Sequence, residues 1–210
     1  MKILVVGGGP AGLYFGILMK RLDPGHNVVV LERNRPDDTF GFGVVFSDKT
    51  IGEVEEADPQ TYQAITDHFI HWDDIDVHYG GEIVRSTGHG FSGLSRQTLL
   101  SVLQEQALAL GIDIRFESEF SGLGPQQSVE CITRDGETEF VSANPEDYDL
   151  VIGSDGVNST LRNDWSEHFQ PTFDWRPNRF VWLGTTKPFP AFTFHFRIPE
   201  SSQQLRKEPT

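Results

Sequence analysis

The chain has 210 residues, of which 37% are apolar, 17 are basic and 31 are acidic, giving a formal net charge of −14. This length suffices for one substantial domain and part of a second, and the acidic balance argues against nucleic acid and anionic membranes as partners, because both require a basic surface. The single cysteine, Cys131, excludes an internal disulfide and a thiolate cluster for zinc or iron–sulfur, so we expect a reducing, cytoplasmic setting.

The first residues carry the pattern of a dinucleotide-binding βαβ unit. An apolar strand at 2–6 leads into Gly7, Gly9 and Gly12, and an apolar helix follows at about 11–22. In such a turn the first glycine permits the tight bend, the second lets the backbone approach a pyrophosphate, and the third lets the helix lie close to the sheet. The helix N-terminus would direct its free N–H groups at the phosphates.

An acidic residue ends the second apolar strand, at 28–31, and strengthens this interpretation. Glu32 follows Gly12 at the spacing from which a carboxylate accepts the ribose hydroxyls of an adenosine. An acid at this position favours an adenosine without a 2′-phosphate, hence FAD or NAD over NADP. A glycine turn in some other α/β protein is the alternative.

Residues 33–47 mix glycine with aromatic residues and predict an ordered loop. The stretch Gly43-Val44-Val45 could pass close to a flat ring, or it could anchor a long connection by ordinary hydrophobic contact. A helix is expected from 48 to about 57, with Pro59 forcing a break.

Residues 68–86 predict a two-stranded excursion, because apolar and polar residues alternate on both sides of a Gly-Gly turn. Metal-ligating side chains are dense here: His68, His71, Asp73, Asp74, Asp76 and His78. The alternation favours a solvated polar strand face over a metal site, so no metal is expected.

A further helix is predicted from Ser95, a candidate N-cap, to Gly111, a candidate C′ residue. The residues before it do not match the G-x-S-x-G motif of a hydrolase elbow, because Leu94 takes the last position. Arg96 stands in the first helical turn, where the helix dipole disfavours a cation. It would either reach a cofactor phosphate or form a surface ion pair.

The remaining pattern continues the α/β alternation. We expect a third parallel strand at 112–116, a second hairpin at 128–141 around an Asp-Gly turn, and a buried strand at 148–153. The last of these places Asp155-Gly156 at a strand's carboxyl end, where ligands collect in open α/β sheets. Residues 179–184 and 191–196 predict two strands of a different sheet.

Three motifs stand in the order of a known family: Gly7-x-Gly9-x-x-Gly12 with Glu32-Arg33, then Ser95-Arg96-x-x-Leu99, then the run from Asp149 through Asp155-Gly156 to Arg162. Together they resemble the single-component FAD-dependent aromatic hydroxylases of the para-hydroxybenzoate hydroxylase type. Longer stretches look most like the subgroup that acts on aryl-CoA thioesters, namely 8–16, 43–48, 71–78 and 180–185.

The resemblance implies an α/β fold: a Rossmann-like FAD-binding parallel sheet with β-hairpin insertions and the start of a second, substrate-binding β-sheet domain. The FAD-binding domain would span 1–165, with hairpins at 68–86 and 128–141. Incomplete strands of the substrate domain would follow at 166–198, and a disordered tail at 199–210.

The resemblance also implies site residues. The FAD adenosine and pyrophosphate would be held by residues of the glycine turn and of the end of the second strand, namely Gly7, Gly9, Pro10, Ala11, Gly12, Glu32 and Arg33. Arg96 would reach the FAD backbone, and Val44 would lie near the ribityl chain or the flavin ring. Asp155 and Gly156 would serve both the flavin pyrophosphate and the nicotinamide donor. No catalytic side chain is identified.

The implied activity is hydroxylation of a small-molecule aromatic substrate, an aryl-CoA thioester by subgroup, with FAD, dioxygen, and NADH or NADPH as electron donor. The family's later Gly-Asp motif has no counterpart in the sequence. We therefore expect an N-terminal portion of a longer protein, completed by a C-terminal portion or an oligomer partner. A non-catalytic flavin-binding fragment and an NAD-dependent dehydrogenase remain as alternatives.

Overall fold

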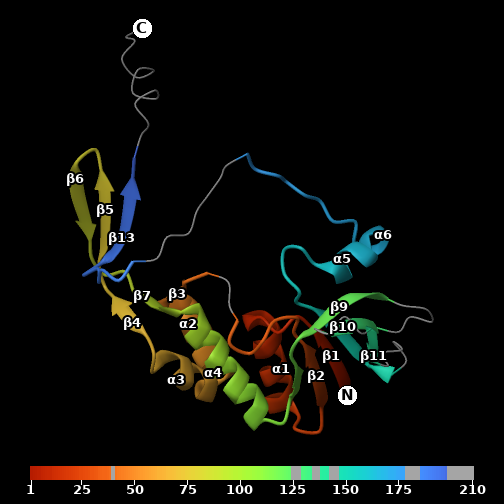
Figure 1. Ribbon diagram of the computed structural model, residues 1–210. Coiled ribbons are helices and arrows are strands. Elements are labelled where there is room, and N and C mark those ends of the chain that lie inside the picture. The colour runs from red at the N-terminus through yellow and green to blue at the C-terminus, as the bar shows by residue number, and fades with distance from the viewer. Residues whose placement is uncertain (39–40, 124–128, 134–137, 142–146, 178–184, 198–210) are drawn as a thin grey trace.

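The computed structural model describes residues 1–38, 41–123, 129–133, 138–141, 147–177 and 185–197. A parallel sheet flanked by helices forms one end of the molecule, and a separate three-stranded sheet projects from the other (Figure 1). Among these residues, no helix is both long enough and apolar enough to cross a bilayer.

The parallel sheet has the strand order β12-β1-β2-β8 and confirms the predicted α/β class. Its strands are β1 (Lys2–Val6), β2 (Asn27–Leu31), β8 (Asp113–Arg115) and β12 (Leu150–Gly153). The apolar side chains of β1 are at most 1% exposed, since both faces of the sheet are covered. The expectation that the last strand is buried is wrong: β12 is an edge strand, and Val151 is 38% exposed.

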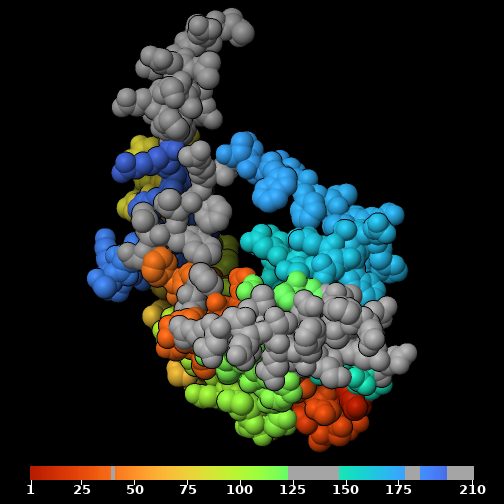
Figure 2. All heavy atoms as spheres, turned by 45° about the vertical axis from the view of Figure 1, so that its right-hand side comes forward, coloured from red at the N-terminus to blue at the C-terminus, as the bar shows by residue number. Residues whose placement is uncertain are grey.

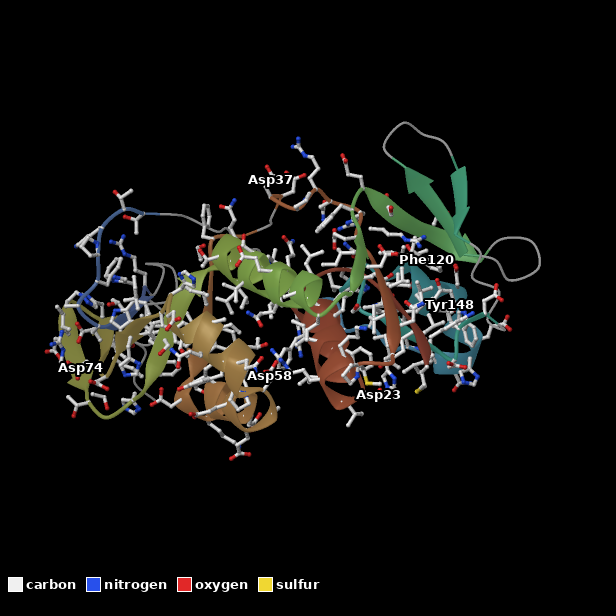
Figure 3. The ribbon with its side chains drawn as sticks, turned by 90° about the horizontal axis from the view of Figure 1, so that it is seen from below. Asp23, Asp37, Asp58, Asp74, Phe120 and Tyr148 are labelled. Carbon is white, nitrogen blue, oxygen red and sulfur yellow. The ribbon has the colours of Figure 1, made fainter. Side chains whose placement is uncertain are left out.

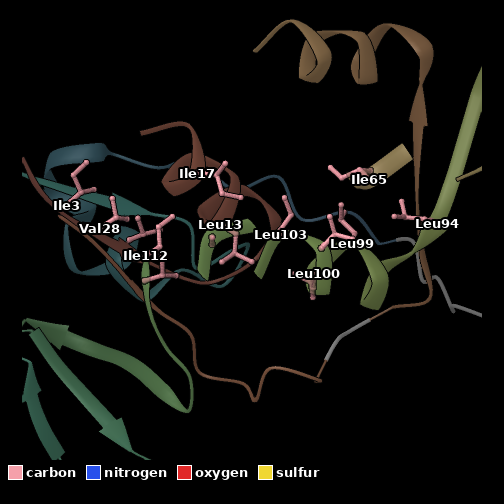
Figure 4. Packing of buried hydrophobic residues seen from close by; sticks show 14 of the residues in the cluster. Ile3, Leu13, Ile17, Val28, Ile65, Leu94, Leu99, Leu100, Leu103 and Ile112 are labelled. Atoms are coloured by element: carbon pink, nitrogen blue, oxygen red, sulfur yellow. The ribbon is translucent and has the colours of Figure 1, made fainter. Parts of the chain in front are cut away.

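One face of this sheet is covered by α1 (Pro10–Leu22), and α4 (Arg96–Ala109) packs against α1. Figure 4 shows a continuous core that runs from the sheet, at Ile3 and Val28, through the apolar side chains of α1 to those of α4. The predicted ends of α4 are confirmed, because the Ser95 hydroxyl accepts a hydrogen bond from the Thr98 N–H, and Gly111 has a φ of +74°.

A further antiparallel sheet is formed by β9 (Ser118–Leu123), β10 (Val129–Thr133) and β11 (Thr138–Val141), and β9 packs on the opposite face of the parallel sheet. The pairing of β10 with β11 confirms the predicted hairpin, whose turn lies outside the described residues, while β9 is an additional strand. Phe120 of β9, labelled in Figure 3, packs against the sheet and is 6% exposed.

A second antiparallel sheet has the order β3-β7-β4, formed by β3 (Gly43–Ser47), β7 (Phe91–Ser95) and β4 (Ile70–Trp72). The segment 33–47, expected as a loop, therefore contains a strand, and so do the residues directly before the α4 helix. Their mixture of glycine and aromatic residues lacks the alternation typical of strands. Each becomes extended because the other supplies its backbone hydrogen-bond partners.

Two short helices follow β3. The predicted helix is confirmed as α2 (Asp48–Ala57), and α3 (Pro59–Thr66) begins directly after it. Pro59 both prevents α2 from continuing and occupies the first turn of α3, where its missing N–H costs nothing. The Asp58 carboxylate caps α3 by accepting a hydrogen bond from the Thr61 N–H.

The projecting sheet has the order β13-β5-β6. The predicted hairpin is confirmed as β5 (Ile75–Tyr79) and β6 (Glu82–Ser86), and β13 (Phe192–Phe196) pairs parallel to β5. The expected solvated face is wrong at Asp76, which is 7% exposed because Arg85 covers its carboxylate with two hydrogen bonds of 2.7 Å.

The helices α5 (Thr160–Asp164) and α6 (Ser166–Phe169) follow β12. In Figure 2 the segment after α6 rises on one side of the molecule and the β13-β5-β6 sheet on the other. The expected strand at 179–184 and the expected tail at 199–210 lie outside the described residues. The predicted domain boundary near residue 165 stays a prediction.

Candidate cofactor-binding site

A cavity of about 230 Å³ opens at the carboxyl ends of β1, β2 and β12. Such a crevice is where open α/β sheets bind ligands. Its lining comes from five segments that are distant in sequence: the glycine turn, the end of β2, the first turn of α4, β9 and the β12–α5 loop. It includes seven residues singled out from the sequence, namely Gly7, Gly9, Glu32, Arg33, Arg96, Asp155 and Gly156.

The glycine turn is packed tightly on one side and open on the other. A Cβ added to Gly12 would lie 2.1 Å from the Gly7 carbonyl oxygen, and one added to Gly7 would lie 2.5 Å from the Ser154 carbonyl oxygen. A Cβ on Gly9 would meet nothing within 4 Å. Gly7 and Gly12 are therefore required by the fold, whereas Gly9 faces space that a ligand could fill.

The N-terminus of α1 borders this space. Its N-cap, Gly9, has no side chain to accept the free N–H groups, and the first turn carries no acidic residue. Pro10 takes the first helical position, and Ala11 lines a neighbouring hollow. The uncapped N–H groups and the positive end of the helix dipole can bind an anionic group such as a phosphate.

Glu32 is held in a defined orientation at the end of β2. Its Oε2 accepts a hydrogen bond of 2.8 Å from the Gly8 N–H, and its Oε1 accepts bonds of 2.8 and 2.7 Å from the backbone and side-chain N–H groups of Asn34. Oε1 has accepted two bonds, whereas Oε2 has accepted one and retains acceptor capacity. The carboxylate can therefore receive ribose hydroxyls without having to reorient.

Two basic residues, Arg33 and Arg96, line the cavity. Arg33 Nη1 lies 3.7 Å from Glu119 Oε1, and both side chains are about half exposed. Arg96 begins α4, and its backbone N–H donates to the Phe42 carbonyl, which fixes the start of the helix. Two guanidinium groups beside an uncapped helix N-terminus suit a doubly charged pyrophosphate.

Asp155 follows β12 and caps α5. Its Oδ2 accepts hydrogen bonds of 2.7 and 3.2 Å from the N–H groups of Thr160 and Leu161. Within the described part of the chain, Asp155 Oδ1 is buried and has no hydrogen-bond partner. That oxygen can accept a further bond from a ligand hydroxyl or a bridging water.

Sequence reasoning missed several lining residues and included others that lie elsewhere. Ser154 Oγ lies 2.9 and 2.8 Å from the carbonyl oxygens of Val6 and Gly7, so it ties β12 to the glycine turn. Ser154 could have been identified from its position next to Asp155 at the end of a strand. The sequence of β9 contains no motif that indicates a lining role. Val44 does not line the cavity, because it pairs with Leu94 in the β3-β7-β4 sheet and packs against the core.

The chain matches the FAD binding domain family over residues 1–193. It is 44% identical to salicyloyl-CoA 5-hydroxylase from Streptomyces sp over 92% of this chain and 34% of that protein. It is 27% identical to 3-hydroxy-4-methyl-anthranilyl-[aryl-carrier protein] 5-monooxygenase from Streptosporangium sibiricum, over 92% of this chain and 49% of that protein.

Among solved structures, the tetrameric form of 2-methyl-3-hydroxypyridine-5-carboxylic acid oxygenase superposes with a TM-score of 0.62 and 24% identity, over 78% of this chain and 41% of that one. This likeness shows the fold. The chain spans between a third and a half of the length of these curated relatives.

Proposed function

This chain belongs to the family of FAD-binding domains, and we propose that the cavity beside Gly9 receives the adenosine and pyrophosphate of FAD. In this arrangement the uncapped N–H groups of α1 bind the pyrophosphate, with Arg96 beside it, and Glu32 accepts the ribose hydroxyls. The open space over Gly9, next to a helix end without a side-chain cap, is the observation that carries this proposal.

The whole protein is proposed to hydroxylate an aromatic substrate with dioxygen and a reduced nicotinamide. The names of the two curated relatives specify aryl groups attached to CoA or to an aryl-carrier protein, which supports an aryl thioester as the substrate class. Bound FAD would supply the redox chemistry, namely uptake of electrons from the nicotinamide and activation of dioxygen.

The residues of this chain would bind and orient the cofactor. The N–H groups of α1 and the two guanidinium groups neutralise the pyrophosphate, which fixes the cofactor along the sheet edge. Asp155, through its free Oδ1, would hold a ligand hydroxyl or water on the far side of the cavity. Phe120 closes the floor of the cavity against water.

FAD binding is tested by titrating the apoprotein with FAD and following the quenching of flavin fluorescence. We expect Arg96→Ala to weaken binding about tenfold or more, the size expected for a hydrogen bond to a charged group. Arg115→Ala is the matched control, because Arg115 pairs with Asp113 and does not line the cavity. Equal affinity in the two variants, or no FAD binding by the unaltered chain, would refute the assignment.

The substrate class is tested with the FAD-loaded protein. An aryl-CoA thioester should accelerate the oxidation of reduced nicotinamide more than the corresponding free aromatic acid does. Stabilisation by NAD without any stabilisation by FAD in a thermal shift assay would instead support the dehydrogenase alternative.

A further inference from the structure

We propose that His78 and His195 form a two-histidine site for a divalent transition metal ion on the polar face of the β13-β5-β6 sheet. The two residues are direct partners in the parallel pairing of β5 with β13. Their ring centroids are 4.2 Å apart, with the ring planes at 43°. Imidazole is a ligand suited to copper, nickel and zinc.

The separation of the rings fits one particular coordination geometry. Two imidazole nitrogens bound to a single ion at a right angle place their ring centroids about 4.5 Å apart, and a tetrahedral angle increases this to about 5 Å. The observed 4.2 Å is closer to the right angle. The outer torsion of histidine has a broad minimum, so both rings can turn a nitrogen toward a shared ion. The spacing can therefore accommodate the tetragonal coordination that Cu²⁺ and Ni²⁺ adopt.

The two faces of this sheet differ in a way that keeps the histidine pair accessible. Alternation along β13 places Phe192, Phe194 and Phe196 on one face and His195 on the other. His195 is exposed and His78 is half-buried. An ion can therefore reach both rings from solvent, and water can fill its remaining positions.

The charges beside the pair attract a cation. On the same sheet, the Asp76 carboxylate lies 2.7 Å from the Arg85 guanidinium and the Asp74 carboxylate lies 3.4 Å from it. Two carboxylates around one guanidinium leave a net negative charge, which attracts cations. Among the described residues, no group of three or more His, Cys, Asp or Glu side chains is placed to hold a metal. The protein therefore supplies two ligands.

A bound ion would join two segments that are far apart in sequence. Among the described strands, β13 pairs with β5 alone. Coordination by both histidines adds a second connection between them, and ligand binding to the paired state stabilises that pairing by mass action.

The test uses the whole chain titrated with Ni²⁺ by calorimetry and with Cu²⁺ by electron paramagnetic resonance. We expect one ion per chain and a Cu²⁺ spectrum with two nitrogen donors. His78→Ala and His195→Ala should each weaken Ni²⁺ binding about tenfold or more. His68→Ala removes an exposed histidine from another part of the molecule and should leave binding unchanged.

Two results would overturn the proposal. One is a Cu²⁺ spectrum of the unaltered chain with a single nitrogen donor. The other is an equal loss of Ni²⁺ affinity in His68→Ala and His195→Ala, which would indicate adventitious binding by scattered histidines. Because His195→Ala could also detach β13, amide hydrogen exchange of β13 is compared in all metal-free variants. If β13 is detached in His195→Ala, the proposal is judged by the Cu²⁺ spectrum of the unaltered chain alone, in which two nitrogen donors support it and one overturns it.

Discussion

The parallel sheet and the projecting β13-β5-β6 sheet are held together by different means. The parallel sheet is covered on one face by α1, with α4 packed behind it, and on the other by β9, and the side chains of β1 are almost entirely inaccessible. In the projecting sheet every residue of β6 is exposed. Its cross-strand pairs are Arg85 with Asp76 and His78 with His195, and Phe192 joins it to Trp72 and Phe91 of the β3-β7-β4 sheet.

This contrast teaches where stability and function reside. Burial on both faces fixes the strands whose carboxyl ends form the cavity, so the candidate site is built on the most rigid part of the molecule. The projecting sheet depends on a few pairs, each worth at most about 1 kcal/mol. Substitutions in the parallel sheet should therefore lower the stability of the whole fold, whereas those in the projecting sheet should lower the stability of that sheet alone.

The largest effect is expected for Gly12→Ala. The new methyl group would lie 2.1 Å from the Gly7 carbonyl oxygen and 2.5 Å from Ser154 Oγ, so the turn, α1 and β12 would all have to shift. We expect a loss of about 3 kcal/mol or more in the free energy of unfolding, measured by chemical denaturation. Because the turn shapes the cavity, FAD affinity should fall as well.

Gly9→Ala is the matched control for that substitution. It meets nothing within 4 Å, so the unfolding free energy should change by less than about 1 kcal/mol while FAD affinity falls. Unchanged FAD affinity in Gly9→Ala would contradict the placement of the pyrophosphate over this glycine.

Asp58→Asn should have the next largest effect. The Asp58 carboxylate is 1% exposed, lies 2.7 Å from Arg21 Nε and caps α3, joining α1 to α3 (Figure 3). The substitution leaves the Arg21 guanidinium, whose side chain is 21% exposed, without its counter-charge, which costs up to about 3 kcal/mol. Thermal or chemical denaturation at neutral pH measures this loss. A change below about 1 kcal/mol would show that the pair contributes little.

The same carboxylate predicts a pH dependence. Burial raises the pKa of Asp58, but hydrogen bonds from Thr61 and Arg21 outweigh it and lower the pKa below its ordinary value. A group whose pKa is lower in the folded state stabilises the fold above its unfolded pKa, near 4, and this stabilisation is lost as the pH falls through the folded pKa. The difference in stability between the unaltered chain and Asp58→Asn should therefore shrink below about pH 4.

Phe192→Ala tests the junction of the projecting sheet with the rest of the molecule. The Phe192 ring is 5.0 Å from that of Phe91 and 5.9 Å from that of Trp72, both in the β3-β7-β4 sheet. Because the side chain is half-buried, we expect the free energy of local opening of β13 to fall by about 2 kcal/mol. Faster amide exchange, limited to β13, measures this loss. Phe196→Ala, at a 55% exposed position, is the control and should have little effect. Equal destabilisation of the parallel sheet by Phe192→Ala would contradict the distinction between that sheet and the projecting sheet.

Arg85→Gln should have the smallest effect. Hydrogen bonds and the charge of Asp76 raise the pKa of the Arg85 guanidinium, and Arg85 in turn lowers the pKa of the Asp76 carboxyl. The Arg85 side chain is 47% exposed, so solvent and salt screen the pair, and its loss should lower the melting temperature less than Phe192→Ala does. The difference between Arg85→Gln and the unaltered chain should diminish at high salt.

Local signals in the sequence determined the glycine turn, the helix behind it, the acid at position 32, the caps of α4 and the hairpin at Gly80-Gly81. Each depends on residues that are close in the chain: a glycine at positive φ, a capping hydroxyl, or an apolar run of fixed period. These features are predictable because the interactions that specify them are themselves local.

Only the tertiary structure decided which strands pair and which side chains become neighbours. It made strands of β3 and β7, placed β12 at an edge, buried Asp76 and set His195 beside His78. It also brought Arg96 and Asp155 to the cavity while Val44 turned to the core. Such contacts join residues that are remote in sequence, and the free energy that selects them comes from burial and backbone pairing across the whole fold.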